Sequence, residues 1–203
     1  MNPSIPTFPV LLQRFFTQRL MQQKRVSAHT ISSYRDTFRL LLRFVQKRLH
    51  TSPERLDFTK LDAPLVGAFL TELEKTRGVT AQTRNLRLTA IRSFFRFAAY
   101  EMPTHSAQIQ RVLAMPAKRF DRKLIDFLTR PEADALLRAP DMSTWSGRRD
   151  HALLLTTLQT GLRLSEVTGL KRRDVTFGTG ARVEVLGKGR RQRAIPLCKP
   201  VAA

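Results

Sequence analysis

The sequence predicts a mainly α-helical protein of two domains, the second of which ends in a small antiparallel β-sheet. Apolar residues recur at three- and four-residue spacing through most of residues 8–170, which is the spacing of one helix face. Beyond residue 174 the spacing changes to two, and glycine-containing segments separate the short runs, as in β-hairpins. The 203 residues suit one large or two small domains, and 42% of them are hydrophobic. This apolar content supports a buried core and excludes disorder of the whole chain.

Residues 1–103 are predicted to form a compact bundle of about four helices. The first helix begins near Phe8 and includes Leu20, and Ser27 is the expected N-cap of the second, which ends at residues 51–53. The third helix spans about 62–75 and stops at residues 77–78, which include Gly78. The fourth starts at Thr80 and continues to residue 100, before a proline.

Residues 104–123 differ in composition from the segments on either side and are expected to be an exposed linker. They contain Pro116, scattered alanine and glutamine, and a basic string made of Lys118, Arg119, Arg122 and Lys123. A basic linker can lie as a strap across a phosphate backbone, and Lys118 and Arg119 are candidate DNA contacts for that reason. Composition equally fits a solvated connector.

Residues 124–203 are predicted to form the second domain. Thr129 and Glu132 have the spacing of a capping box at the start of a helix. A further apolar helix is expected over residues 148–158, and a short one over 164–170. Three short β runs follow, at residues 175–177, 183–185 and 194–197, and they predict a small antiparallel sheet.

The charge of the chain points to a polyanionic partner. It has 36 Lys and Arg against 16 Asp and Glu, a formal net charge of +20. Residues 1–104 carry 17 basic and 7 acidic side chains, and residues 105–203 carry 19 and 9, so each half has the same excess of +10. Both domains are therefore expected to lie against the same polyanion, and nucleic acid is the usual one.

Several classes of protein are excluded by simple counts. The single cysteine, Cys198, rules out an intramolecular disulfide, and no Cys/His cluster has the spacing of zinc ligands, so no metal site is expected. The apolar runs are far shorter than the ~20 residues of a membrane span. The N-terminus lacks a basic segment before its apolar stretch, which argues against a signal peptide. A cytoplasmic protein without a membrane partner is expected.

Two motifs in the second domain carry chemical information. In residues 160–170, Gly161 ends a helix and Arg163 stands at the entry to the next, where a guanidinium and free backbone N–H groups can bind an oxyanion such as phosphate. Glu166 lies three residues further on and is close enough to brace Arg163. In residues 187–193, glycines flank Lys188 on a predicted β-turn, which lets the backbone approach a nucleic acid strand closely. Each motif alone is also typical of an ordinary helix C-cap or surface turn, and their joint occurrence in this order favours the functional interpretation.

With these motifs, the chain resembles the tyrosine recombinases, or phage-type integrases. The stretch TGLRLSEVTGLKRRDV resembles the first conserved box of that family, and VEVLGKGRRQRAIPL resembles its catalytic-lysine hairpin. The bundle over residues 1–103 resembles the SAM-like core-binding domain, so residues 124–203 are expected to be the N-terminal part of an α+β catalytic domain. The resemblance covers essentially the whole chain, and the two boxes together are its specific part.

The resemblance implies a mechanism and a role for each residue of the site. Two domains of a recombinase clamp double-stranded DNA, and a tyrosine attacks a phosphodiester without metal or other cofactor. Arg163 then corresponds to the first catalytic arginine, which holds the scissile phosphate. Lys188 corresponds to the general acid that protonates the leaving 5′-oxygen. Glu166 orients its neighbours and takes no part in the chemistry. Candidate DNA contacts in the hairpin are Arg190, Arg191 and Arg193. Arg193 is the weaker candidate for a phosphate contact and is more typical of an arginine satisfied on a strand surface.

The sequence also departs from the family pattern. The family's later part carries an H-x-x-R box and the nucleophilic tyrosine, and none of His29, His50, His105 and His151 here has an arginine three residues later. The only tyrosines, Tyr34 and Tyr100, lie in the predicted N-terminal bundle and suit its core or surface. The expected protein is thus a recombinase interrupted within its catalytic domain, through gene decay, a frameshift or an incomplete record.

The sequence therefore predicts a DNA-binding protein of the recombinase or integrase type, from a mobile element, that is unable to cleave DNA by itself. Double-stranded DNA is the expected partner, with assembly of several copies on DNA and no small-molecule substrate. One alternative is a non-catalytic DNA clamp that modulates full-length recombinases. Another is an RNA-binding or ribosomal protein, which the charge alone supports and which lacks an aromatic RNA-reading motif.

Overall fold

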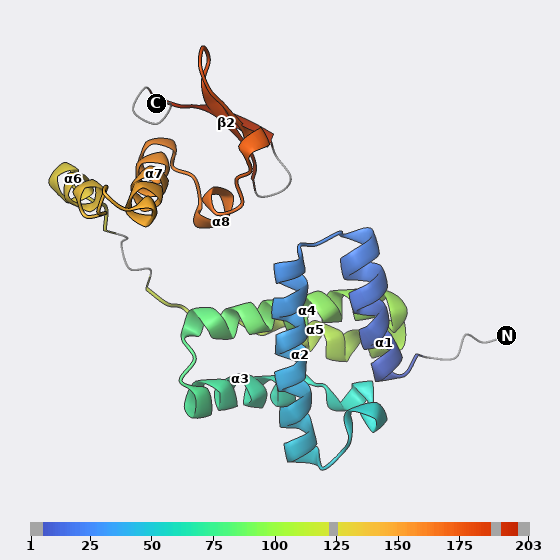
Figure 1. Ribbon diagram of the computed structural model, residues 1–203. Coiled ribbons are helices and arrows are strands. Elements are labelled where there is room, and N and C mark those ends of the chain that lie inside the picture. The colour runs from blue at the N-terminus through green and yellow to red at the C-terminus, as the bar shows by residue number, and fades with distance from the viewer. Residues whose placement is uncertain (1–5, 122–125, 188–191, 199–203) are drawn as a thin grey trace. The chain divides into compact units, whose positions relative to one another are not determined.

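The computed structural model describes residues 6–121, 126–187 and 192–198. The chain divides into two compact units, Met1–Arg122 and Lys123–Ala203, called unit 1 and unit 2 below. Unit 1 is entirely helical over its described residues, and unit 2 combines helices with a small sheet (Figure 1). The predicted class, mainly α with a small antiparallel sheet, is confirmed.

Three helices of unit 1 are capped by polar residues at or near their predicted starts. Ser27, Asp62 and Thr80 each accept a hydrogen bond from the backbone N–H three residues further along, at 3.3, 2.8 and 3.2 Å. Main-chain donors that have no partner inside the helix are satisfied in this way. The helices of unit 1 are α1 (Phe8–Arg14), the π-helix η1 (Phe15–Gln23), α2 (Ala28–Leu49), the 3₁₀ turns η2 (Pro53–Arg55) and η3 (Phe58–Lys60), α3 (Ala63–Arg77), α4 (Ala81–Glu101), the 3₁₀ turn η4 (Pro103–His105) and α5 (Ser106–Ala114).

The core of unit 1 is built around one aromatic ring. Phe94 of α4 is fully buried, and its ring centroid lies 5.8 Å from that of Phe8, 5.5 Å from Phe15 and 5.3 Å from Phe38. These three rings come from α1, η1 and α2, and each meets Phe94 edge-on, which is a favoured arrangement of aromatic pairs. The N-terminal elements are therefore fixed to α4 through a single cluster.

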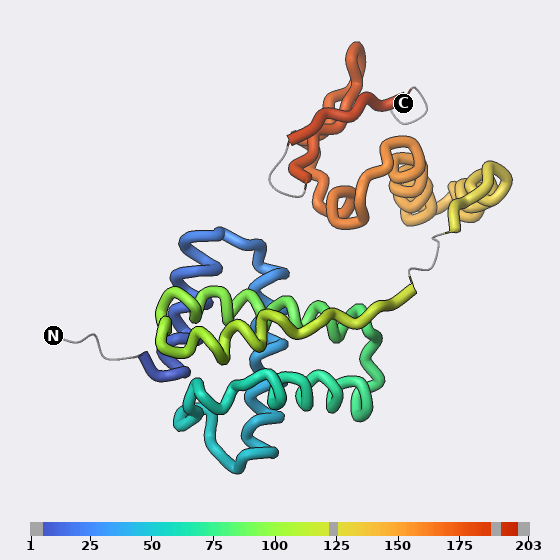
Figure 2. The backbone as a smooth tube through the Cα atoms, turned by 180° about the vertical axis from the view of Figure 1, so that it is seen from behind, coloured from blue at the N-terminus to red at the C-terminus, as the bar shows by residue number. Residues whose placement is uncertain are grey.

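Part of the expected linker over residues 104–123 is folded instead. Residues 106–114 form α5, and its Ile109 and Val112 are completely buried in the core of unit 1. Figure 2 shows α5 running beside α4, and the contacts between these two helices are extensive. Because Ile109, Val112 and Leu113 share one face, packing against α4 stabilises a helix whose composition alone does not mark it as one.

Unit 2 begins with helices and ends with a meander of three strands. The capping box at Thr129 and Glu132 is confirmed, with Glu132 Oε2 accepting the backbone N–H of Thr129 at 2.8 Å. The strands pair antiparallel in the order β1–β2–β3, with Val183 opposite Ile195 and Val185 opposite Arg193. The elements are α6 (Arg130–Arg138), α7 (Trp145–Thr160), α8 (Leu164–Val167), the 3₁₀ turn η5 (Arg172–Asp174), β1 (Val175–Thr176), β2 (Arg182–Leu186) and β3 (Gln192–Pro196).

The helices of unit 2 differ from their predicted bounds. The helix expected over residues 148–158 extends further at both ends as α7, because Thr144 caps its start and Gly161 its end. The helix expected over residues 164–170 ends at Val167, and Leu170 packs against the small core beside the sheet.

Unit 2 has a small core. Among the described residues of this unit, the buried apolar ones are Leu162, Val167, Val183 and Val185. By contrast α6 contains no buried residue and α7 only Gly147, so apolar side chains of α7 such as Trp145 and Leu158 are exposed. Over the described residues, no helix has the length and apolarity needed to cross a bilayer.

Candidate functional site

Arg163 stands at the turn between α7 and α8. Gly161 ends α7 in the left-handed conformation, with φ of 62°, and its N–H donates to the carbonyl of Thr157. The next residue, Leu162, is 4% exposed and anchors the turn in the core. Arg163 follows in an extended conformation as the N-cap of α8, with 60% of its side chain exposed. The turn therefore places a guanidinium at the surface from a buried anchor.

Glu166 accepts three hydrogen bonds in the structure. Its Oε2 accepts the backbone N–H of Arg163 at 2.8 Å, and its Oε1 accepts Nη1 of the same residue at 3.1 Å. Oε2 also accepts Nη2 of Arg193 at 2.9 Å. The hydrogen bond from the Arg163 N–H, aided by both guanidinium groups, holds the pKa of Glu166 below its ordinary value although burial raises it. Glu166 is therefore a carboxylate that binds two arginines.

One detail of the expected anion site is different in the structure. The sequence predicts free backbone N–H groups beside Arg163, but the N–H of Arg163 itself donates to Glu166. The predicted bracing of Arg163 by Glu166 is present, and the same contact removes that N–H as a phosphate donor. What Arg163 can offer a phosphate is the exposed part of its guanidinium.

Arg193 joins this cluster from the sheet. It lies on β3 opposite Val185 of β2, and directly opposite residues in an antiparallel pair share a face. Val185 is buried and Ile195 packs against the same core, so this face of the sheet is the one turned toward the interior of unit 2. The alternation of residues 193, 195 and 197 in the sequence is a signal that would have placed Arg193 on this side. The contact with Glu166 itself joins residues that are distant in sequence.

Three predicted residues of the hairpin, Lys188, Arg190 and Arg191, lie outside the described residues. The strands on either side are paired up to Leu186 opposite Gln192. The predicted hairpin is therefore confirmed in its strands.

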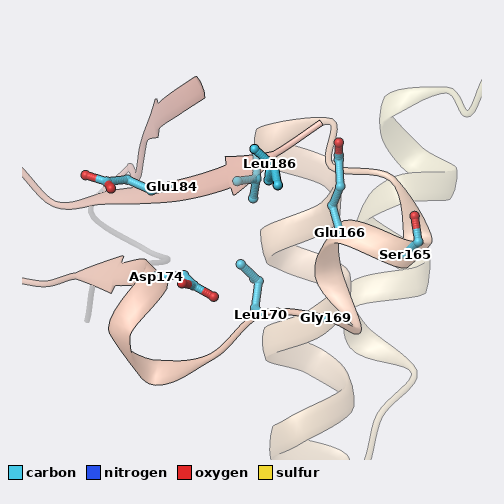
Figure 3. Close-up of a pocket in the computed structure, with 8 residues that line it drawn as sticks. Ser165, Glu166, Gly169, Leu170, Asp174, Glu184 and Leu186 are labelled. Atoms are coloured by element: carbon cyan, nitrogen blue, oxygen red, sulfur yellow. The ribbon is translucent and has the colours of Figure 1, made fainter. Parts of the chain in front are cut away.

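Glu166 also lines a pocket of about 250 Å³ (Figure 3). Its ionisable side chains are carboxylates, from Glu166, Asp174 and Glu184. Three carboxylates repel a phosphate, so an anion is expected on the arginine side of Glu166 and not in this pocket. Among the residues that the structure describes, no three His, Cys, Asp or Glu side chains are grouped closely enough to hold a metal ion.

Lys118 and Arg119, the two candidate DNA contacts in the predicted linker, belong to unit 1. Lys118 Nζ lies 2.8 Å from Glu74 Oε1, and the Lys118 backbone is hydrogen-bonded to Asn85 of α4. Arg119 follows and is exposed. Lys118 is thus held against α3 and α4, a contact that sequence reasoning missed.

Both tyrosines also belong to unit 1. Tyr34 packs against the aromatic core, with its ring stacked on Phe15 at a centroid distance of 6.3 Å. Tyr100 is 77% exposed at the end of α4, and the guanidinium of Arg19 lies 6.0 Å from its ring centroid. These positions agree with the predicted core and surface roles.

Comparison with protein families assigns both parts of the chain. Residues 13–102 match the family described as phage integrase, N-terminal SAM-like domain, and residues 126–203 match the phage integrase family. The first match lies within unit 1 and the second within unit 2.

Curated relatives carry recombinase names. The integrase/recombinase y4rC of Sinorhizobium fredii (strain NBRC 101917 / NGR234) is 65% identical over 193 residues, which are 95% of this chain and 58% of that protein. The integrase/recombinase y4rD of the same strain is 42% identical over 95% of this chain and 69% of its own length. Tyrosine recombinase XerC of Rhodospirillum centenum (strain ATCC 51521 / SW) is 35% identical over 90% of this chain and 53% of its own length. The chain thus spans between half and about two thirds of these relatives.

Solved structures show the same fold. A complex of the site-specific recombinase XerH with its difH substrate superimposes with a TM-score of 0.61 at 22% identity, over 86% of this chain and 50% of that one. A λ integrase dimer bound to a core site gives a TM-score of 0.63 at 18% identity, over 94% and 62%. Its matches over both units and its identity to these relatives show that the chain belongs to the phage integrase family of tyrosine recombinases.

Proposed function

We propose that this chain is a DNA-binding member of its family that acts on double-stranded DNA in site-specific recombination or integration. Its relatives carry integrase and recombinase names, and both solved structures described above are complexes with DNA. The equal excess of positive charge in the two halves supports contact of both units with one duplex.

The observation that carries this proposal is the Arg163–Glu166–Arg193 cluster. A carboxylate that is 7% exposed binds two arginines whose side chains are 60% and 41% exposed, so two cations are held together at the surface by one anion. The cluster keeps a net positive charge, and the more exposed guanidinium, that of Arg163, has further N–H donors for phosphate oxygens. A surface of this kind favours binding of a phosphodiester.

In the proposed chemistry, Arg163 stabilises the negative charge that develops on the non-bridging oxygens of the scissile phosphate. Lys188 is the proposed general acid, which gives its proton to the 5′-oxygen as the bond from phosphorus to that oxygen breaks. The nucleophile in this reaction is a tyrosine hydroxyl, which ends as a 3′-phosphotyrosyl ester. Neither tyrosine of this chain lies in unit 2 with the proposed phosphate site, so these 203 residues are proposed to bind DNA without cleaving it.

The positive charge of both halves also supports a second candidate function, a DNA clamp that does not cut. A chain that binds the same DNA and does not cut it can compete with, or assemble beside, a complete recombinase. Assembly of several copies on one DNA site is part of both proposals. Adding a full-length relative to DNA bound by this chain separates them, since a modulator changes the recombination rate of that relative.

The proposal is tested by binding to a duplex that the chain enriches from a randomised pool. Phosphate contacts release counterions, so the affinity is expected to fall by about a thousandfold between 50 and 200 mM salt if six or more phosphates are contacted. Arg163→Gln is expected to weaken binding by about tenfold through loss of a charge-assisted contact. The matched control is Arg130→Gln. Arg130 is 88% exposed on α6, and its replacement removes the same charge as Arg163→Gln. An affinity that hardly depends on salt, or equal losses in the two variants, contradicts the proposed site.

A further inference from the structure

The guanidinium of Arg193 is engaged by a side chain of its own protein. Its Nη2 lies 2.9 Å from Oε2 of Glu166, and the same oxygen accepts the backbone N–H of Arg163 at 2.8 Å. The other oxygen, Oε1, accepts Nη1 of Arg163 at 3.1 Å. A single carboxylate thus joins the third strand of the sheet to the residue at the entry of α8.

We propose that Arg193 is a positioning residue, which acts on phosphate binding through Glu166 and Arg163 and does not itself contact the DNA. The inference rests on the proposed function in one respect, namely that Arg163 binds phosphate. It replaces both interpretations that the sequence leaves open for Arg193, a phosphate contact or a satisfied surface arginine.

Burial supports this order of action. The carboxylate of Glu166 is 7% exposed, whereas the Arg163 side chain is 60% exposed. The protected member of the cluster is therefore the one that both arginines share, and the more accessible guanidinium is that of Arg163. Without Arg193, Oε2 of Glu166 keeps only the main-chain N–H, and the carboxylate is freer to leave its bidentate contact with Arg163.

The sheet gives Arg193 a rigid base. Its partner Val185 is buried, and its neighbour but one, Ile195, lies opposite the buried Val183. Arg193 therefore projects from a face that is fixed by packing. In the sequence, Lys188 lies between β2 and β3, and Arg193 belongs to the strand that follows it. Through its hydrogen bond to Glu166, Arg193 therefore links this strand to the turn that carries Arg163.

The first test measures the carboxylate in the protein without DNA. The side-chain carboxyl of Glu166 is titrated by carbon-detected NMR in the full chain, and its signal is assigned by its loss in Glu166→Gln. In Arg193→Gln the pKa of Glu166 is expected to rise toward its ordinary value, because a nearby positive charge has been removed. Arg193→Lys keeps the charge and is expected to restore most of the difference.

The matched control is Arg182→Gln. Arg182 lies on the adjacent strand β2, its side chain is 46% exposed against 41% for Arg193, and its Nε lies 3.0 Å from Glu184. The Arg182→Gln variant removes the same charge from the same sheet and should leave the pKa of Glu166 unchanged. If Arg182→Gln and Arg193→Gln move that pKa equally, the specific contact is refuted.

The second test is a double-mutant cycle on DNA binding. Arg193→Gln alone is expected to weaken binding to the enriched duplex by about fivefold, and to have no further effect in a chain that already carries Arg163→Gln. A direct phosphate contact predicts the opposite, a further loss in the Arg163→Gln background together with a salt dependence reduced by about one counterion. That result, with normal circular dichroism of each variant, overturns the proposal.

The experiments distinguish a failure of the proposed function from a failure of the positioning role of Arg193. A wild-type chain that binds no duplex in a salt-dependent way refutes the proposed function and, with it, the link from Arg193 to phosphate binding. Salt-dependent binding with additive effects of Arg163→Gln and Arg193→Gln leaves the proposed function standing and refutes the positioning role alone.

Discussion

Asn85 and Lys118 exchange two hydrogen bonds. Asn85 Nδ2 donates to the Lys118 carbonyl at 2.8 Å, and the Lys118 N–H donates to Asn85 Oδ1 at 2.9 Å. A side-chain amide can satisfy the backbone N–H and C=O of one residue in this way. Together with the ion pair between Lys118 and Glu74, this exchange fixes the chain that leaves α5 against α3 and α4.

Replacing Asn85 is expected to free this segment for proteolysis. In the wild-type chain, trypsin should cut first after Arg119 or at the basic residues beyond it, because the Lys118 backbone is held on α4. In Asn85→Ala, cleavage after Lys118 should rise by about thirtyfold, since two hydrogen bonds of about 1 kcal/mol each are lost. The products are identified by mass spectrometry. Gln82→Ala, an exposed position on the first turn of α4, is the control, and a cut after Lys118 that is equally fast in all three chains contradicts the tether.

The ion pair between α2 and α4 is expected to make the stability of unit 1 dependent on pH. Arg87 Nη2 lies 2.5 Å from Asp36 Oδ2, and Arg87 Nη1 also bonds Thr37 at 3.1 Å. Burial raises the pKa of Asp36, but hydrogen bonds from Arg39 and Arg87 outweigh it and hold that pKa below 3.8. A lowered carboxyl pKa stabilises the fold above the unfolded value of 3.8, and this stabilisation is lost as the pH falls through the folded value.

Arg87→Met is expected to lower the free energy of unfolding by about 1–2 kcal/mol at pH 7, and by less at pH 3. The measurement is urea unfolding followed by circular dichroism at both pH values. Arg39→Met is the control, because Arg39 binds the same carboxylate from its own helix with a side chain that is 59% exposed. Its effect should stay within about 0.5 kcal/mol, as for exposed helix pairs. Equal effects of the two variants argue against the bridge between helices as the source of stability.

Two glycines of unit 2 should respond differently to substitution by alanine. Gly161 has a positive φ with open space around its Cα, so Gly161→Ala should cost about 1 kcal/mol of backbone strain. A methyl group on Gly147 would overlap the carbonyl of Asp141, so Gly147→Ala should cost more. Urea unfolding followed by circular dichroism measures both effects. Ser146→Ala is the neighbouring control, and a Gly147→Ala variant as stable as that control would show that the turn at Asp141 can move.

The 203 residues are expected to form no covalent adduct with DNA. Tyr34 is packed in the core of unit 1, and Tyr100 lies at the end of α4 in the same unit, whereas the proposed phosphate site is in unit 2. A nucleophile must reach the phosphate directly for the reaction to proceed. A nicked suicide duplex, analysed on a denaturing gel, tests this. A protein–DNA band that disappears in Tyr34→Phe or Tyr100→Phe would place the nucleophile in unit 1, and a band that needs an added full-length relative would indicate assembly in trans.

Local signals in the sequence predicted the ends of most helices. Ser27, Asp62 and Thr80 act within their own turn, so their capping role can be recognised without knowledge of the fold. Helix α5 was missed because its stability comes from burial of Ile109 and Val112 against distant parts of unit 1, while Pro116 and the basic string beyond it indicate a linker. The π-helix η1 continues the apolar pattern of α1, and apolar spacing does not distinguish the two helix types at this length.

In the candidate site too, the local contact was predicted and the contact between distant segments was not. The bracing of Arg163 by Glu166 was predicted, since residues three apart on a helix are neighbours. The contact of Glu166 with Arg193 depends on the register of β2 and β3 and on the packing of that sheet against α8, neither of which is local. The roles of Arg163, Lys188 and Glu166 remain predictions.

The position of Phe94 has a consequence for synthesis of the protein on the ribosome. Three of its ring partners, Phe8, Phe15 and Phe38, precede it by long stretches of chain, and most of unit 1 separates Phe8 from Phe94. The N-terminal helices therefore emerge into the cell before the residue that completes their core has been made. Non-local closure of this kind is slow relative to formation of a helix. A nascent chain halted before α4 would keep its aromatic side chains accessible to chaperones, and release of α4 from the exit tunnel is the event that hides them.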